Sequence, residues 1–143
     1  MNPFIQLLAA LVSTAGFCLL YHIRAQLVPF SALGGVLSWG FYLLLERADA
    51  APFYPVLFSG VFAAVYSELM AKCVRAPATI FLIPALIPLV PGGSLYYTML
   101  ALVERDEARF RQQGMLTLQW VIALAAGISL VAVARQILKT RRR

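Results

Sequence analysis

The chain has 143 residues, of which 62% are apolar and only 13% are charged, with a formal net charge of +6. Its mean hydropathy is +0.82, whereas about 25% of the residues in a soluble domain are charged. This composition excludes a water-soluble enzyme and a disordered tail. It also excludes a nucleic-acid-binding protein, because the basic residues flank apolar runs.

Five runs of the sequence contain no charged residue, and each holds 18 to 28 residues. About 20 apolar residues suffice for a helix to cross a bilayer. The sequence therefore predicts an all-α integral membrane protein, with one transmembrane domain over residues 1–143 and about five transmembrane helices. We expect these spans near residues 3–21, 27–45, 53–71, 78–103 and 115–134.

The basic residues predict the orientation. Five crossings place eight basic residues on one side and four on the other, and the basic side favours the cytoplasm. We therefore expect the N-terminus outside and the C-terminus in the cytoplasm. The eight are Arg24, Lys72, Arg75, Arg135, Lys139, Arg141, Arg142 and Arg143. A re-entrant fourth segment would give four crossings and an even distribution, so five crossings are favoured. We interpret the basic tail as an anchor against anionic lipid.

The fourth span contains residues that break helices. Within ten residues it holds Pro84, Pro88, Pro91, Gly92 and Gly93. One proline in a helix interior costs about 3 kcal/mol. Because hydrocarbon cannot solvate freed carbonyls, irregular backbone at this depth must be buried in protein or line a wet cavity. We expect the helix to break at Pro88–Gly93, near the bilayer midplane.

A new helix is expected to start at Ser94, a residue type that often caps helix N-termini. Its free amides and the positive end of its dipole would favour an anion. Broken helices of this kind mark the substrate sites of secondary transporters. The alternative is a kinked helix whose prolines only shape packing.

Glu68 lies one turn from the predicted cytoplasmic end of the third span. It forms either an interfacial pair with Lys72 at i+4 or a buried carboxylate that binds a proton or a substrate ammonium group. Lys72 and Arg75 are candidates to meet a carboxylate at the inner mouth, although orientation alone explains them. Tyr96 and Tyr97 could offer hydroxyls to a ligand, although packing is the more common role of such aromatics.

The sequence gives no indication of an enzyme, a cofactor or a metal site. His22 is the single histidine, and no phosphate-binding, nucleophile or zinc motif occurs. The two cysteines, Cys18 and Cys73, are interpreted as apolar packing residues.

Two segments, Ser67–Phe81 and Ile87–Gly92, resemble the threonine/serine exporter family, with further agreement in Gly16–Tyr21 and Leu33–Trp39. The resemblance covers about residues 15–105. It is closest to the family's small, separately encoded membrane subunit, which is equivalent to the C-terminal half of the fused exporters.

The resemblance implies a secondary transporter of the bacterial inner membrane that exports small carboxylates, coupled to the proton gradient. The substrates are threonine and serine in some members and succinate-like dicarboxylates in two-subunit members. It also implies a larger complementary membrane subunit, or assembly with copies of the same chain. Family motif positions fall on Glu68, Pro77, Thr79, Pro88, Pro91 and Gly92.

The candidate substrate contacts are therefore Glu68, Thr79, Pro88, Pro91, Gly92, Gly93, Ser94 and Tyr96, with Lys72, Arg75 and Tyr97 along a substrate or proton path. A non-transporting scaffold that stabilises a larger transport subunit is the main alternative function. A small homo-oligomeric channel ranks last.

Overall fold

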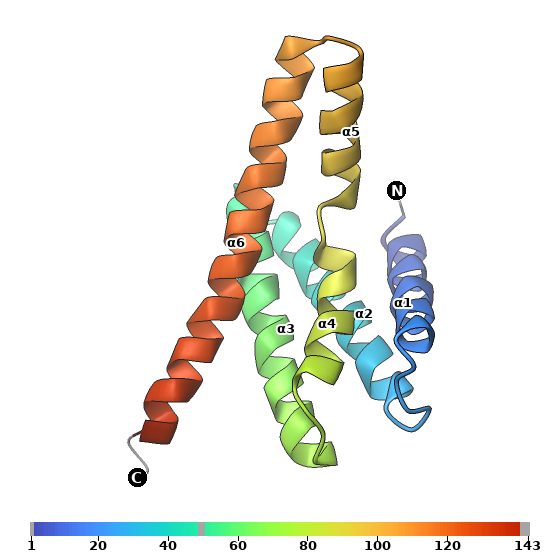
Figure 1. Cartoon of the computed structure of the whole chain (residues 1–143), viewed down its shortest axis with the longest axis vertical. Helices are drawn as coiled ribbons and strands as arrows, with labels where there is room; N and C mark the ends of the chain where they lie inside the picture. The colour runs from blue at the N-terminus through green and yellow to red at the C-terminus, as the bar shows by residue number, and fades with distance from the viewer. Residues whose placement is uncertain (1, 49–50, 141–143) are drawn as a thin grey trace.

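The computed structural model describes residues 2–48 and 51–140. All the regular elements in these ranges are helical (Figure 1). They are α1 (Pro3–Leu20), α2 (Val28–Glu46), α3 (Phe53–Val74), α4 (Thr79–Leu86), the short 3-10 helix η1 (Ile87–Leu89), α5 (Gly92–Val103) and α6 (Glu107–Thr140). Of the predicted basic tail, Arg141, Arg142 and Arg143 lie outside the described residues.

The helices confirm a membrane-spanning α-helical fold. Four of them, α1, α2, α3 and α6, are long and apolar enough to cross a bilayer. The α4–η1 and α5 segments pass the same test together and are bent by 50° at the break. Both run toward the same end of the molecule (Figure 1), so the pair has the form of one broken crossing rather than of a hairpin that returns.

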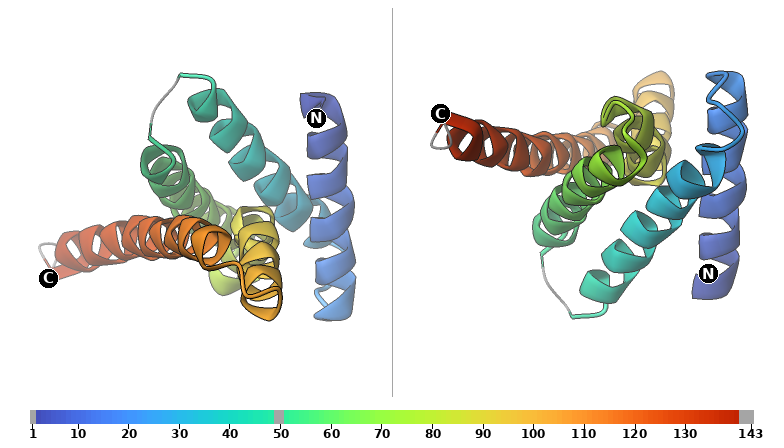
Figure 2. Two further views of the ribbon diagram at one scale, coloured as in Figure 1. Left: turned by 90° about the horizontal axis from the view of Figure 1, so that it is seen from above. Right: turned by 90° about the horizontal axis from the view of Figure 1, so that it is seen from below.

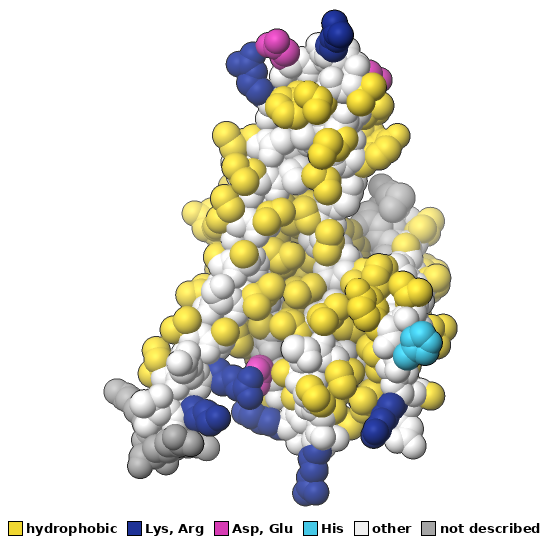
Figure 3. Space-filling model, viewed as in Figure 1, with side chains coloured by type: hydrophobic (Ala, Val, Ile, Leu, Met, Phe, Trp, Pro, Cys, Tyr) yellow, Lys and Arg dark blue, Asp and Glu magenta, His cyan; other side chains and the backbone are white. Residues whose placement is uncertain are grey.

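Charged side chains gather at the two ends of the molecule, with a largely apolar surface between them (Figure 3). The connection between α1 and α2 and the C-terminal ends of α3 and α6 lie at one end, and the α5–α6 turn lies at the other (Figure 1). The end-to-end separation of charge is the arrangement that the uncharged runs predicted.

Small residues bring the helices together. A Cβ added at Gly127 of α6 would lie 2.5 Å from the Leu57 carbonyl oxygen of α3, and one at Gly34 of α2 would lie 2.7 Å from the ring of Tyr66. Gly35 lies directly against Thr14 of α1. These contacts show that the small residues of α2 and α6 allow close helix packing.

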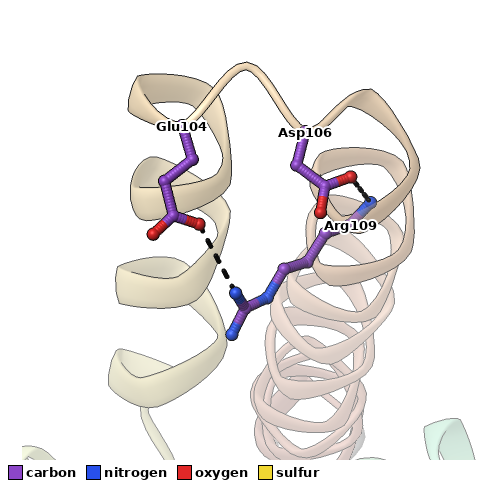
Figure 4. Close-up of polar contacts among 3 residues, drawn as sticks. All are labelled: Glu104, Asp106 and Arg109. Atoms are coloured by element: carbon purple, nitrogen blue, oxygen red, sulfur yellow. Dashed lines mark hydrogen bonds and ion pairs between the residues drawn. The ribbon is translucent and has the colours of Figure 1, made fainter.

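The last helix is longer than the sequence predicted. It begins at Glu107 rather than near residue 115 and continues to Thr140. Asp106 explains the early start, because its carboxylate accepts a hydrogen bond of 3.0 Å from the amide of Arg109 (Figure 4). The Arg109 guanidinium also lies 3.5 Å from Glu104 across the turn. Both side chains are about half exposed, so this ion pair adds little stability.

Seen from above and below, the helix axes are splayed, and α6 leans away from α1 and α2 (Figure 2). It packs chiefly against α3 on one side and α5 on the other. Beyond the ends of α2 and α3, α5 and the first half of α6 continue as a two-helix hairpin (Figure 1). Apolar side chains on this hairpin remain exposed, among them Tyr96, Met99, Leu102 and Met115.

Candidate functional site

The break in the fourth span has the position that the prolines predicted. Helix α4 ends at Leu86 and passes into η1, which contains Pro88, before the chain leaves helical geometry at Val90. Pro91 occupies the N-cap position of α5, and Gly92 is the first residue of that helix. Ser94 is therefore not the N-cap that the sequence predicted. Its hydroxyl instead donates to the Pro91 carbonyl at 3.2 Å.

The helix starts two residues early because Gly92 turns directly into it. The Gly92 amide donates to the Val90 carbonyl at 2.8 Å, and the Leu95 amide donates to the Pro91 carbonyl at 3.0 Å. Between them, the amides of Gly93 and Ser94 have no hydrogen-bond acceptor within the described part of the chain. No side chain caps this helix. Two donors at the positive end of a helix dipole are thus free for an anionic ligand.

The two glycines leave the start of α5 accessible. A Cβ added at Gly92 or Gly93 would meet nothing within 4 Å, and neither residue has a positive φ. Neither backbone strain nor tight packing therefore demands glycine here. The bare backbone instead permits a close approach to the amides from outside this chain.

The freed carbonyl on the other side of the break has a partner. The Trp120 indole N–H of α6 donates to the Leu89 carbonyl at 2.7 Å. The Trp120 ring lies 5.2 Å from that of Tyr42, which stacks on Trp39 at 4.8 Å. The Trp120 hydrogen bond thus satisfies the Leu89 carbonyl with a protein donor, which hydrocarbon could not supply.

Sequence reasoning missed the roles of Trp120 and Tyr42. The sequence did contain an indication for Trp120, because an indole N–H inside an apolar run needs a hydrogen-bond acceptor. The carbonyls that the prolines leave without a helical donor are such acceptors. The pairing of Trp120 with Leu89 could not be predicted, since these two residues are 31 positions apart in the chain.

The break lies level with the middle of α6 but near the C-terminal end of α2 and the N-terminal end of α3. Leu89 is fully buried and clusters with Ala123, at the centre of α6, and with Tyr42 and Val56, within four residues of the ends of their helices. The break therefore coincides with the middle of α6, as a position near the bilayer midplane requires, but not with the middle of α2 or α3.

Glu68 lies apart from the break, in a groove between α3 and α6. Its carboxylate accepts a hydrogen bond of 2.6 Å from the guanidinium of Arg135, 67 residues further along the chain. The Glu68 side chain is only 22% exposed. The i+4 pair with Lys72, one of the two alternatives for Glu68, is not formed among the described side chains, where Arg135 of α6 is the partner. Lys72 lines the same groove.

The remaining candidates are dispersed. Thr79 lies at the start of α4 and lines a small cavity of about 170 Å³ beside the α1–α2 connection, together with Tyr21. Arg75 is the exposed residue that ends α3, in a left-handed conformation. Tyr96 is 63% exposed on α5. The Tyr97 ring lies 5.6 Å below the guanidinium carbon of Arg109.

The structure thus brings Pro88, Pro91, Gly92, Gly93 and Ser94 together at the break but does not bring Glu68, Thr79 or Arg75 to them. Within this chain, Glu68 and the α5 N-terminus belong to separate places. The small cavity reaches the start of η1 at Ile87, whereas the α3–α6 groove lies away from the break. Neither of these two cavities is lined by Gly92, Gly93 or Ser94.

These features define a multi-pass membrane protein with a discontinuous helix, the class of architecture that secondary transporters use. The family model described as "Threonine/Serine exporter, ThrE" matches residues 6–134. The chain therefore belongs to the threonine/serine exporter family, whose members are transporters. No solved structure matches it.

Proposed function

We propose that this chain is a membrane subunit of a secondary exporter of small carboxylates, such as threonine, serine or a succinate-type dicarboxylate, in the bacterial inner membrane. The free amides of Gly93 and Ser94 at the start of α5 are the observation that carries this proposal. They hold the substrate carboxylate by hydrogen bonds and by the helix dipole. Family membership supplies the transport function itself.

The binding site is completed by a second protein. In support, the start of α5 opens outward, and one face of that helix carries exposed apolar side chains, including Leu95, Tyr96 and Met99. A larger complementary subunit, or another copy of this chain, would cover that face and enclose the substrate. An inverted pair of five-span halves, with the substrate between them, is a common transporter arrangement.

Glu68 has a different role in this proposal, at the cytoplasmic end of the transport path. The Glu68 carboxylate, 2.6 Å from the Arg135 guanidinium and only 22% exposed, is the acidic group that we assign to the coupling of export to the proton gradient. Lys72 and Arg75 lie at the same end and add positive charge there.

The experiment compares Gly93→Pro with Gly93→Ala in cells that express this chain and a complementary family subunit but no other exporter. Proline removes the amide hydrogen at the second helical position, where a helix tolerates it. The preceding Gly92 has no Cβ to clash with the ring. Alanine adds a Cβ in open space and keeps the amide.

Losing one hydrogen bond to a charged group costs about 1.5–3 kcal/mol. We therefore expect Gly93→Pro to reduce saturable efflux of labelled threonine, serine or succinate by about tenfold or more. Gly93→Ala keeps the amide hydrogen, so it should lose less efflux than Gly93→Pro, with equal amounts of assembled complex for both variants. Equal efflux from the two variants would contradict the proposed carboxylate contact.

A non-transporting scaffold is the second candidate. The observation that favours it is that neither described cavity is lined by Gly93 or Ser94, combined with the exposed apolar face of α5. A scaffold would tolerate Gly93→Pro as long as the complex still assembles, and the partner alone would then transport at the full rate.

A further inference from the structure

The groove between α3 and α6 is the largest described cavity, at about 850 Å³. It exists because the two helices are in close contact at Gly127 and diverge from there toward their C-terminal ends (Figure 1). No other helix fills the space between the diverging ends, since α6 packs chiefly on α3 and α5.

The groove has an apolar wall and a basic end. Eight of its lining side chains are apolar: Phe58, Val61, Val65, Leu69, Leu130, Val131, Ala134 and Leu138. The other four are Glu68, Lys72, Arg135 and Lys139. The charged residues therefore amount to three cations and one carboxylate, all supplied by the C-terminal parts of α3 and α6.

Glu68 is already paired with Arg135 at 2.6 Å. The ammonium groups of Lys72 and Lys139 have no acidic partner among the described side chains. The basic end of the groove consequently carries about two uncompensated positive charges. These cations lie where the apolar wall ends. The lining thus changes from apolar to basic along the groove, as a phospholipid changes from acyl chain to anionic headgroup.

We propose that the α3–α6 groove binds an anionic phospholipid, with an acyl chain along the apolar wall and the phosphate between Lys72 and Lys139. Basic pockets between transmembrane helices on the cytoplasmic side are typical sites for such headgroups. A small carboxylate fits less well, because most of the lining offers it no hydrogen bond. This site is independent of the amides at the start of α5.

The test measures how much phosphatidylglycerol and phosphatidylcholine the purified full chain retains in detergent, by native mass spectrometry. The Lys72→Gln/Lys139→Gln variant removes the two unpaired charges and keeps the Glu68–Arg135 pair. Its matched control, Arg24→Gln/Arg111→Gln, removes two positive charges outside the groove. A third variant, Ala134→Phe, narrows the apolar part of the groove without changing its charge.

The wild-type chain should retain phosphatidylglycerol at least tenfold more than phosphatidylcholine. The lysine variant should lose about tenfold or more of that preference, since each of the two basic residues near the headgroup raises the binding constant about fivefold. The control should keep it, and Ala134→Phe should retain less of both lipids.

Three results would overturn the proposal. Equal retention of the two lipids by the wild type would show that no headgroup is recognised. An equal effect of the two double variants would show only a general charge effect. Displacement of phosphatidylglycerol by millimolar inorganic phosphate or succinate would identify a site for free anions instead. None of these results bears on efflux in the Gly93 variants, so the two proposals fail separately.

Discussion

Single hydrogen bonds decide how the fourth span can be broken inside an apolar environment. The Leu89 carbonyl loses its helical donor at the break and accepts from Trp120 instead. On the other side, the Gly93 and Ser94 amides have no acceptor among the described residues. The break is therefore asymmetric: its carbonyl is satisfied by α6, while its amides stay free.

Trp120→Phe tests the hydrogen bond that satisfies the Leu89 carbonyl at the break. Phenylalanine keeps most of the ring packing but leaves the Leu89 carbonyl without a donor, which costs about 1–3 kcal/mol. We expect a lower midpoint of thermal unfolding in lipid nanodiscs. Trp39→Phe serves as the control, because no hydrogen bond of its indole appears among the described residues. An unchanged midpoint for Trp120→Phe would mean that another group satisfies the carbonyl.

Ser38 offers a second test at this scale. Its hydroxyl is fully buried and has no hydrogen-bond partner in the described part of the chain. Ser38→Ala should leave thermal stability unchanged or raise it by about 1 kcal/mol, because an unsatisfied polar group is removed. Ser59→Ala is the matched control, since the Ser59 hydroxyl donates to the Pro55 carbonyl at 2.7 Å. Greater loss for Ser38→Ala than for Ser59→Ala would reveal an unrecognised partner of Ser38.

At the scale of elements, close helix contacts depend on a few glycines. A Cβ at Gly127 would lie 2.5 Å from the Leu57 carbonyl oxygen and 3.0 Å from the Val61 nitrogen, both backbone atoms that cannot move aside alone. The same addition at Gly16 of α1 would meet nothing. The two glycines therefore serve different purposes despite similar positions within apolar helices.

Gly127→Ala should separate α3 from α6 and destabilise the fold by about 1–3 kcal/mol through overpacking. Gly16→Ala should have no such cost, and its better helix propensity adds up to about 1 kcal/mol. Thermal unfolding of the two variants in nanodiscs, followed by tryptophan fluorescence, provides the comparison. Equal midpoints would show that the α3–α6 contact is looser than the structure indicates.

The sequence could predict which segments form helices but not how they associate. Runs without charge gave the spans, and three prolines with two glycines gave the position of the break, because both signals are local. The early start of α6 was missed since polar residues precede its apolar run. The Glu68–Arg135 and Trp120–Leu89 pairs join residues far apart in the chain, so local patterns could not reveal them.

At the scale of the whole molecule, the chain alternates direction, and the basic side chains on the face drawn in Figure 3 gather at the two ends of the molecule (Figures 1 and 3). The end that carries Arg24, Lys72, Arg75, Arg135 and Lys139 is the more basic one among the described residues. From the positive-inside rule we expect this end to face the cytoplasm.

Reporter fusions test that orientation. A fluorescent protein at the C-terminus should fold and fluoresce, because it stays in the cytoplasm, whereas alkaline phosphatase at the same position should be inactive. Phosphatase inserted at the α5–α6 turn, after Arg105, should be active. The reverse pattern, or activity at both positions, would contradict the five-span orientation.

In the function proposed for this chain, the exposed amides at the start of α5 hold a substrate carboxylate. Solid-state NMR of the ¹⁵N-glycine-labelled chain, reconstituted in lipid with a complementary family subunit, observes one of them directly, with Gly93→Ala assigning the resonance. Titration with the exported carboxylate should shift the Gly93 amide saturably, while Gly127 in the α3–α6 contact stays unchanged. A Gly93 resonance that does not move at concentrations that saturate efflux would contradict the claim.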